Sequence, residues 1–184
     1  MAKKTTRIMT MTAVLAAVSI VLSYFEIPII PAFPFLKLDF AEVPIILCAL
    51  FLGPVPAITA EGIRNLFALL LTGTATLGIG TLANFILGTL FVLALHLYVR
   101  NTNHKYNRFV GLLAASIFIT LAASILNLVI FVPLYQMVGM FPQGVAPICF
   151  VIAGILPLNL IKWPLLSIIS AVIFRYTEKY FKLY

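Results

Sequence analysis

Four polar side chains stand inside segments that are otherwise apolar, and they are the residues best suited to bind a small molecule. They are Asn84, Asn127, Asn159 and Lys162. An ionisable side chain at membrane depth costs about 2.5–3.5 kcal/mol on insertion scales, so it is usually paired or lines a cavity. Asn159 and Lys162 would share one helix face. Amide groups and an ammonium group suit hydrogen bonding to the carbonyl or carboxylate groups of a ligand.

Each polar group also has a plainer interpretation. A single asparagine in an apolar helix commonly makes inter-helix hydrogen bonds that only hold a bundle together. The set that includes Lys162 favours a binding site. Glu61 and Arg64 have the spacing of a helix-local ion pair, for which we expect a structural role. We expect Asp39 and Glu42 to complement the dipole at the start of a helix.

The composition indicates the elements that must position these groups. The chain has 184 residues, of which 63% are hydrophobic and 9% are charged, whereas an average soluble domain has roughly 25% charged residues. A soluble fold could not cover its surface with so few charges. One membrane-spanning helix needs about 20 apolar residues. We therefore predict an all-α integral membrane protein, a six-transmembrane-helix bundle forming a single membrane domain over residues 1–184.

The apolar runs are separated by turns and by one proline-rich stretch. The expected spans cover residues 7–24, 41–52, 57–72, 79–99, 109–135 and 158–176. Between the first two spans, prolines break helical hydrogen bonding in residues 25–40, although this stretch is strongly apolar. We expect this long external loop to fold back as a lid over the polar cluster. Phe33, Phe35 and Leu36 would then contact a ligand.

Charge gives the expected orientation. Six spans place both termini on one side of the membrane, and most of the basic residues fall on that side. The positive-inside rule assigns that side to the cytoplasm. The same rule explains the net charge of +7, so no nucleic-acid partner is expected. Ala13 and Ala17 form a small-xxx-small pair, which allows another helix to approach closely.

Catalytic signatures are missing from the sequence. It has no P-loop, no H-E-x-x-H and no G-x-S-x-G motif. A small intramembrane enzyme would need a nucleophile or an acid–base pair near Lys162, and a pore would need polar residues through its full depth. His96 and His104 have no metal-ligand partner at a useful spacing. We expect a binding protein that needs no cofactor and no metal.

Four stretches carry a resemblance to a known family. They are PFLKLDFAEVPIILCALFLGPVPAI (residues 34–58), GIRNLFALLLTGTATLGIGTLANFILG (62–88), ILNLVIFVPLY (125–135) and LPLNLIK (156–162). The chain resembles the S-components of energy-coupling-factor (ECF) vitamin transporters, most closely the riboflavin-binding members. Pantothenate and pyridoxine or pyrimidine-type members share much of this pattern. Trp163 and Pro164 depart from it, because a small residue is expected after the lysine, and a tryptophan there could reshape the pocket.

The resemblance implies a high-affinity vitamin receptor in a prokaryotic cell membrane. Such a receptor works with a transmembrane coupling subunit and two cytoplasmic ATPase subunits, which hydrolyse the ATP. The first helix contacts the coupling subunit through the positions of Ala13 and Ala17. In riboflavin-binding members, residues matching Asn127, Asn159 and Lys162 hydrogen-bond the ring system.

Overall fold

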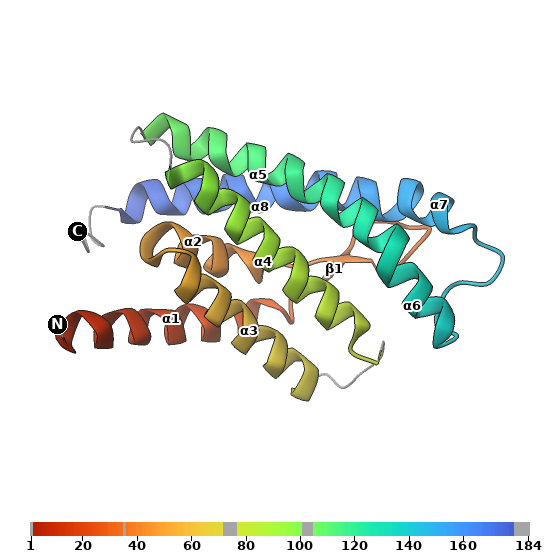
Figure 1. The fold of residues 1–184 in the computed structure, drawn as a ribbon, viewed down its shortest axis with the longest axis horizontal. Helices are drawn as coiled ribbons and strands as arrows, with labels where there is room; N and C mark the ends of the chain where they lie inside the picture. Colours follow the sequence, from red (N-terminus) through yellow and green to blue (C-terminus); the bar gives the residue numbers. More distant parts are fainter. Residues whose placement is uncertain (1, 35, 72–76, 101–104, 179–184) are drawn as a thin grey trace.

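The computed structural model describes residues 2–34, 36–71, 77–100 and 105–178. These residues form a bundle of helices with one short pair of strands (Figure 1). The helices are α1 (Ala2–Leu22), α2 (Glu42–Leu52), α3 (Pro54–Leu71), α4 (Ile79–Arg100), α5 (Lys105–Leu126), α6 (Val132–Met137), α7 (Pro147–Phe150) and α8 (Leu156–Thr177). The start of α1 and the end of α8 lie at the same end of the bundle (Figure 1).

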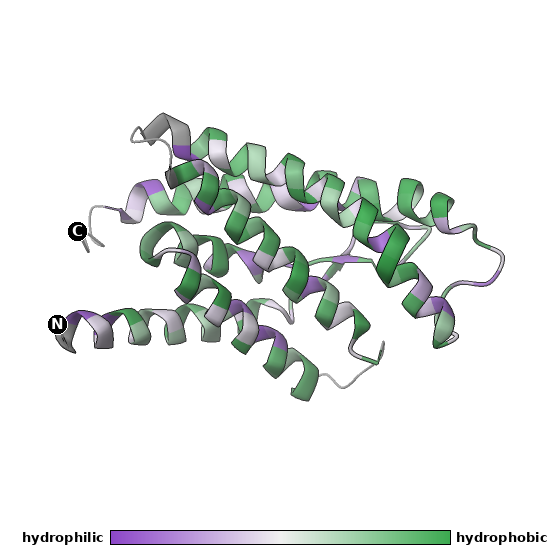
Figure 2. Cartoon of the chain, in the orientation of Figure 1, coloured by the Kyte–Doolittle hydropathy of each residue, from purple (hydrophilic) through white to green (hydrophobic). Residues whose placement is uncertain are grey.

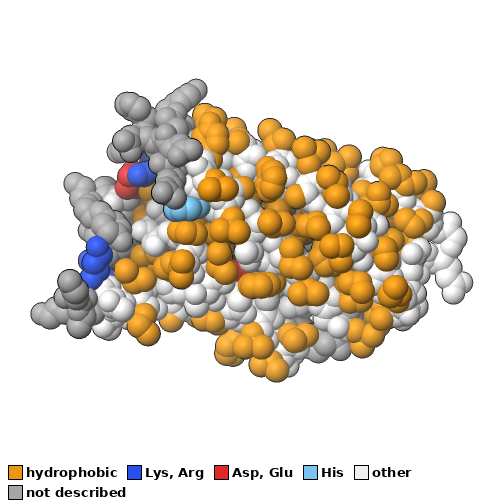
Figure 3. Space-filling model, in the orientation of Figure 1, with side chains coloured by type: hydrophobic (Ala, Val, Ile, Leu, Met, Phe, Trp, Pro, Cys, Tyr) orange, Lys and Arg blue, Asp and Glu red, His pale blue; other side chains and the backbone are white. Residues whose placement is uncertain are grey.

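Four of the described helical stretches are long and apolar enough to cross a membrane. They are Lys4–Leu22, Ile79–Val99, Arg108–Met137 and Pro147–Thr177. α2 is apolar but shorter. Most of the helical ribbon is coloured as hydrophobic, and hydrophilic residues lie along the middle of α3 (Figure 2). On the face drawn in Figure 3, the lysines and arginines lie at the end where α1 begins.

Two helices continue through a proline, although a proline in a helix interior removes a backbone donor and usually bends or ends the helix. A π-helical stretch, η1 (Asn127–Phe131), joins α5 to α6 just before Pro133, and η2 (Val151–Ile155) joins α7 to α8 just before Pro157. In each, an amide bonds the carbonyl five residues back, as from Val132 to Asn127. Such a π-bulge re-satisfies the backbone around a missing donor.

The last helix begins before residue 158, where the last span is expected to start. The helix is continuous over Pro147–Thr177, so Lys162 lies near its middle. The third helix likewise begins before residue 57, where the third span is expected to start. α3 begins at Pro54, because prolines are tolerated in the first turn of a helix. Gly53, with φ +94°, makes the turn between α2 and α3.

Residues 25–40 fold into a small hairpin. β1 (Ile27–Pro28) pairs antiparallel with β2 (Lys37–Leu38), with Ile27 opposite Leu38. β2 contacts α8, so the end of the hairpin lies against the helix that carries Lys162. Lys37 and Glu26 form an exposed ion pair at 2.6 Å between Nζ and Oε2. The prolines of this segment prevent it from forming a helix, and its apolar side chains hold it against the bundle.

Candidate ligand-binding site

Lys162 is buried and already has a counter-ion. Its Nζ lies 3.1 Å from Oδ2 of Asp39, and the two side chains are 9% and 11% exposed. Asp39 lies in the segment that precedes α2, and its Oδ1 accepts the backbone N–H of Ala41 at 2.9 Å. This pair joins residues that are 123 positions apart in the chain. Asp39 therefore bonds the backbone at the start of α2, as expected, and also pairs with Lys162.

Asn159 lies one turn before Lys162 and is tied to its own helix and to α5. Its Nδ2 donates to the carbonyl of Ile155 at 2.8 Å, and its Oδ1 accepts the indole N–H of Trp163 at 2.9 Å. The hydroxyl of Thr120 on α5 donates to the Asn159 carbonyl at 3.2 Å. Trp163 also stacks on Phe91 with ring centroids 4.7 Å apart, so it fills the space between α4 and α8.

Asn127 opens the π-helical stretch η1 and is buried. Its Nδ2 donates to the Ala123 carbonyl at 2.8 Å. Because Thr120 bonds Asn159, Asn127 lies about 10 Å further from the end of the bundle that holds the start of α1, at 1.5 Å per residue. Asn84 on α4 is exposed, unlike the other three residues. The expected cluster of four polar residues is therefore three buried residues at different heights along the bundle and the exposed Asn84, whose role in binding stays a prediction.

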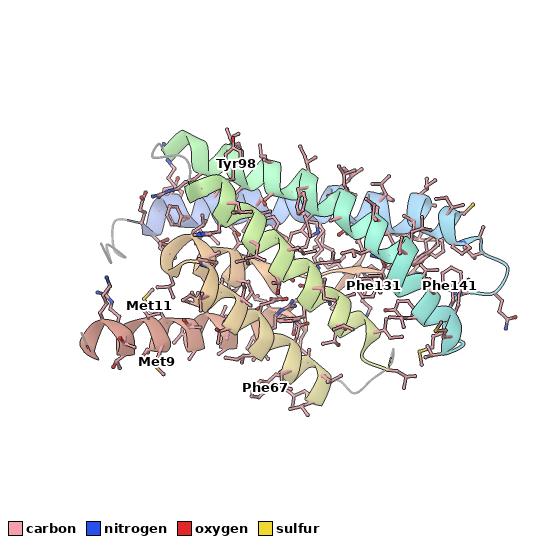
Figure 4. All side chains as sticks on the ribbon, in the orientation of Figure 1. Met9, Met11, Phe67, Tyr98, Phe131 and Phe141 are labelled. Carbon is pink, nitrogen blue, oxygen red and sulfur yellow. The ribbon has the colours of Figure 1, made fainter. Side chains whose placement is uncertain are left out.

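The aromatic part of residues 25–40 packs where the two π-helical stretches meet. Phe33 is buried and makes an edge-to-face contact with Phe150 of α7, with ring centroids 5.0 Å apart. Phe141, labelled in Figure 4, makes a similar contact with Phe150 at 5.4 Å. A Cβ on Gly154 would lie 2.8 Å from the Phe33 ring and 2.9 Å from Cδ1 of Leu36. Phe35 lies outside the described residues.

A second buried group of charges lies beside the Lys162–Asp39 pair. Arg64 bonds Glu61 on its own helix, as its spacing predicted, and also Glu42 of α2 at 2.8 Å. Glu42 was expected to complement the α2 dipole, but its side chain turns inward because Arg64 supplies a stronger, buried partner. A Cβ on Gly88 of α4 would lie 2.6 Å from Oε1 of Glu61. Asn65 also donates to that oxygen, at 2.8 Å.

These neighbours set the charge of Asp39. Burial by itself raises the pKa of the Asp39 carboxyl. The positive charges of Lys162 and Arg64, together with the Ala41 N–H hydrogen bond, more than offset burial and hold the pKa below its usual value. Asp39 is therefore ionised at neutral pH, and the Lys162 ammonium faces a full negative charge.

Comparison with known proteins identifies the family to which this chain belongs. The family model of the substrate-specific component of ECF transporters matches residues 7–174. The chain belongs to this family. It is 34% identical over 166 residues to the riboflavin transporter FmnP of Bacillus subtilis (strain 168), covering 88% of this chain and 87% of the relative. It is 31% identical over 173 residues to the riboflavin transporter RibU of Staphylococcus aureus (strain TCH60), covering 92% and 89%.

The fold is also similar to that of a solved structure. The S component of a bacterial ECF transporter superposes with a TM-score of 0.80 at 30% identity, over 97% of this chain and 99% of the other. This S component is accordingly a membrane transport protein, and its family associates with ECF transporter complexes.

The first helix of this S component presents its small residues outward. Ala13 and Ala17 are exposed, whereas Ala16 between them is buried against the bundle. A helix surface with small side chains permits close approach by another helix. The pair is thus accessible for the contact that the sequence suggested.

A surface cavity lies apart from these groups. Its volume is about 570 Å³, and it opens where α1 meets the hairpin segment. Its lining consists of Leu22, Tyr24, Phe25, Glu26, Ile27 and Phe40. None of the residues predicted to bind ligand lines this cavity.

Asp39, the partner of Lys162, is the residue of this candidate site that sequence reasoning missed. A lysine at membrane depth needs a counter-ion, and the chain has only five acidic residues. Glu61 was already matched with Arg64. That shortage of carboxylates was the available signal, and it would have directed attention to Asp39 or Glu42.

Proposed function

We propose that this S component is a high-affinity receptor for riboflavin, which it delivers for ATP-driven uptake through an ECF complex. The observation that carries the proposal is the likeness to two riboflavin transporters over about nine-tenths of the chain. S components bind substrate and do not hydrolyse ATP, so this chain would act without a catalytic step.

The charge state of Lys162 supports an uncharged ring as the ligand. Its ammonium group is paired with Asp39 in a buried setting, so a ligand carboxylate is not needed to balance it. A carboxylate would instead meet the repulsion of Asp39. Ring carbonyls and imide groups suit the remaining N–H donors of Lys162 and the amides of Asn127 and Asn159. This favours riboflavin over pantothenate.

The hairpin segment would act as a lid in this mechanism. Residues 25–40 cover the outer part of the bundle, and Phe33 and Leu36 pack closely on Gly154 of η2. We expect this packing to be adjusted as the ring system binds, with Phe35 contributing to the same aromatic cover. Asn84 would face the ligand only if α4 or the lid moved, since its side chain is exposed.

The family supports an expected membrane arrangement and a set of expected partners. α2 and α3 would complete six spans, and the shared end of α1 and α8 would be cytoplasmic. The partners would be a transmembrane coupling subunit, contacted through Ala13 and Ala17, and two cytoplasmic ATPase subunits. The cell membrane of a prokaryote would be the location.

The absorbance spectrum of the purified protein tests the substrate. A riboflavin receptor should carry the yellow chromophore through purification, and heat should release a compound with the mass of riboflavin. Release of pantothenate or of a pyridoxine-type vitamin from a colourless protein would refute the assignment and name the alternative.

A further inference from the structure

We infer that Asp39 is a positioning residue for Lys162, holding its ammonium group in the direction needed to meet the ligand. This role rests on the proposed function, because it concerns the same binding site. It adds a residue of the hairpin segment to the three polar residues of η1 and α8.

Both oxygens of the Asp39 carboxylate are engaged. Oδ1 accepts the Ala41 N–H at 2.9 Å, and Oδ2 faces Nζ of Lys162 at 3.1 Å. The first contact fixes the carboxylate to the backbone at the start of α2. The second therefore gives Nζ a defined direction instead of a range of rotamers.

A fixed direction matters because lysine is flexible. Its side chain carries about 2 kcal/mol of rotamer entropy, and ordering it during ligand binding would weaken affinity. Asp39 orders it beforehand. An ammonium group has three N–H donors, so the bond to Asp39 leaves donors for a ring carbonyl.

The neighbouring carboxylates are poorly placed to replace Asp39. Glu42 is bonded to Arg64 at 2.8 Å, and Glu61 is bonded to both Arg64 and Asn65. Removing the Asp39 charge would therefore leave Lys162 without its partner at hydrogen-bonding distance. A buried ammonium group without a counter-ion is strongly destabilised. The Lys162 side chain would then turn towards another hydrogen-bond acceptor.

Asp39 also connects the hairpin to α8. Asp39 directly follows β2, and β2 contacts α8. The ion pair therefore couples the position of the hairpin's end to the position of the Lys162 ammonium group. A movement of residues 25–40 would move Asp39 and so change the direction of Lys162.

A double-mutant cycle tests the role. Riboflavin affinity would be measured by fluorescence titration for wild type, Asp39→Asn, Lys162→Met and the double variant. Each single change should weaken binding tenfold or more. The double variant should bind no more weakly than Lys162→Met, because Asp39 acts through the lysine. Glu26→Gln, which removes an exposed charge of the same segment, should leave affinity unchanged.

Two results would overturn the inference. One is wild-type affinity in a folded Asp39→Asn variant. The other is losses that multiply in the double variant, which would show that Asp39 supports binding independently of Lys162. Asp39→Glu keeps the charge and should fold and bind with intermediate affinity, which covers the case in which Asp39→Asn does not fold.

Failure of the riboflavin assignment can be distinguished from failure of the inference about Asp39. If riboflavin is not the ligand, the wild-type protein itself does not bind riboflavin. The same four proteins would then be titrated with the vitamin that mass spectrometry finds in the purified wild type. The cycle then shows in the same way whether the effect of Asp39→Asn on affinity requires Lys162.

Discussion

Gly154→Ala tests how strongly the hairpin segment closes the bundle. The added Cβ would lie 2.8 Å from Cδ2 of Phe33 and 2.9 Å from Cδ1 of Leu36. Carbon atoms prefer separations of about 3.5–4.0 Å. Phe33 and Leu36 would therefore have to withdraw from α8 and η2, and residues 25–40 would be displaced with them.

The size of the effect follows from the overlap. Adding a methyl group to a packed site typically costs about 1–3 kcal/mol. This strain exists only while the segment is closed, because opening the segment removes the contact. At about 1.4 kcal/mol per factor of ten, riboflavin should dissociate roughly 5- to 150-fold faster from the variant.

The assay is the recovery of flavin fluorescence after the riboflavin-loaded protein is diluted. Gly111→Ala is the matched control, because its Cβ would lie 2.7 Å from the Tyr98 ring, far from the hairpin (Figure 4). That control should lower thermal stability and leave the dissociation rate unchanged. An unchanged rate for a folded Gly154→Ala protein would refute the view that these contacts retain the ligand.

Three further changes have defined outcomes. Gly88→Ala should lower the stability measured by thermal unfolding in detergent by about 1–3 kcal/mol, because the new Cβ would press on the Glu61 carboxylate. Ala13→Trp with Ala17→Trp should abolish uptake of labelled riboflavin by cells holding the full complex, while the purified variant binds riboflavin normally. Asn127→Ala should weaken riboflavin binding about 3- to 10-fold, as expected for one lost hydrogen bond, in an equilibrium titration.

Controls separate these outcomes from general damage. Ile117→Trp with Leu121→Trp places the same bulk at the same spacing on an exposed face of α5, and uptake should stay normal. Normal uptake by the Ala13→Trp, Ala17→Trp variant would contradict the proposed interface on α1.

The Cβ added by Gly62→Ala would lie 3.6 Å from the Phe85 ring, an ordinary contact distance, so this variant should be as stable as wild type. If Gly88→Ala is also as stable as wild type, the packing described for Glu61 is wrong.

The helices could be predicted because they depend on local composition. Long apolar runs and the scarcity of charge require helices in a membrane protein. The Glu61–Arg64 pair was predictable for the same reason, since its partners are one turn apart on α3. The family was correctly predicted from four stretches of sequence.

Contacts between distant segments could not be predicted in this way. No helical or strand periodicity relates Asp39 to Lys162. Glu42 was assigned to the dipole of its own helix α2, and its ion pair with Arg64 of α3 was not predicted. The start of the last helix at Pro147 could not be predicted, because Pro157 has the sequence signature of a helix break. The π-helical stretch before it absorbs the missing hydrogen bond, and such stretches leave little trace in composition.

Equilibrium titration of the purified, ligand-stripped protein with riboflavin tests the central claim most directly. Flavin fluorescence should be quenched in a saturable manner at one riboflavin per chain, and an excess of pantothenate or pyridoxine should not displace it. A folded protein that leaves riboflavin fluorescence unchanged, or that releases riboflavin when pantothenate is added, would contradict the account.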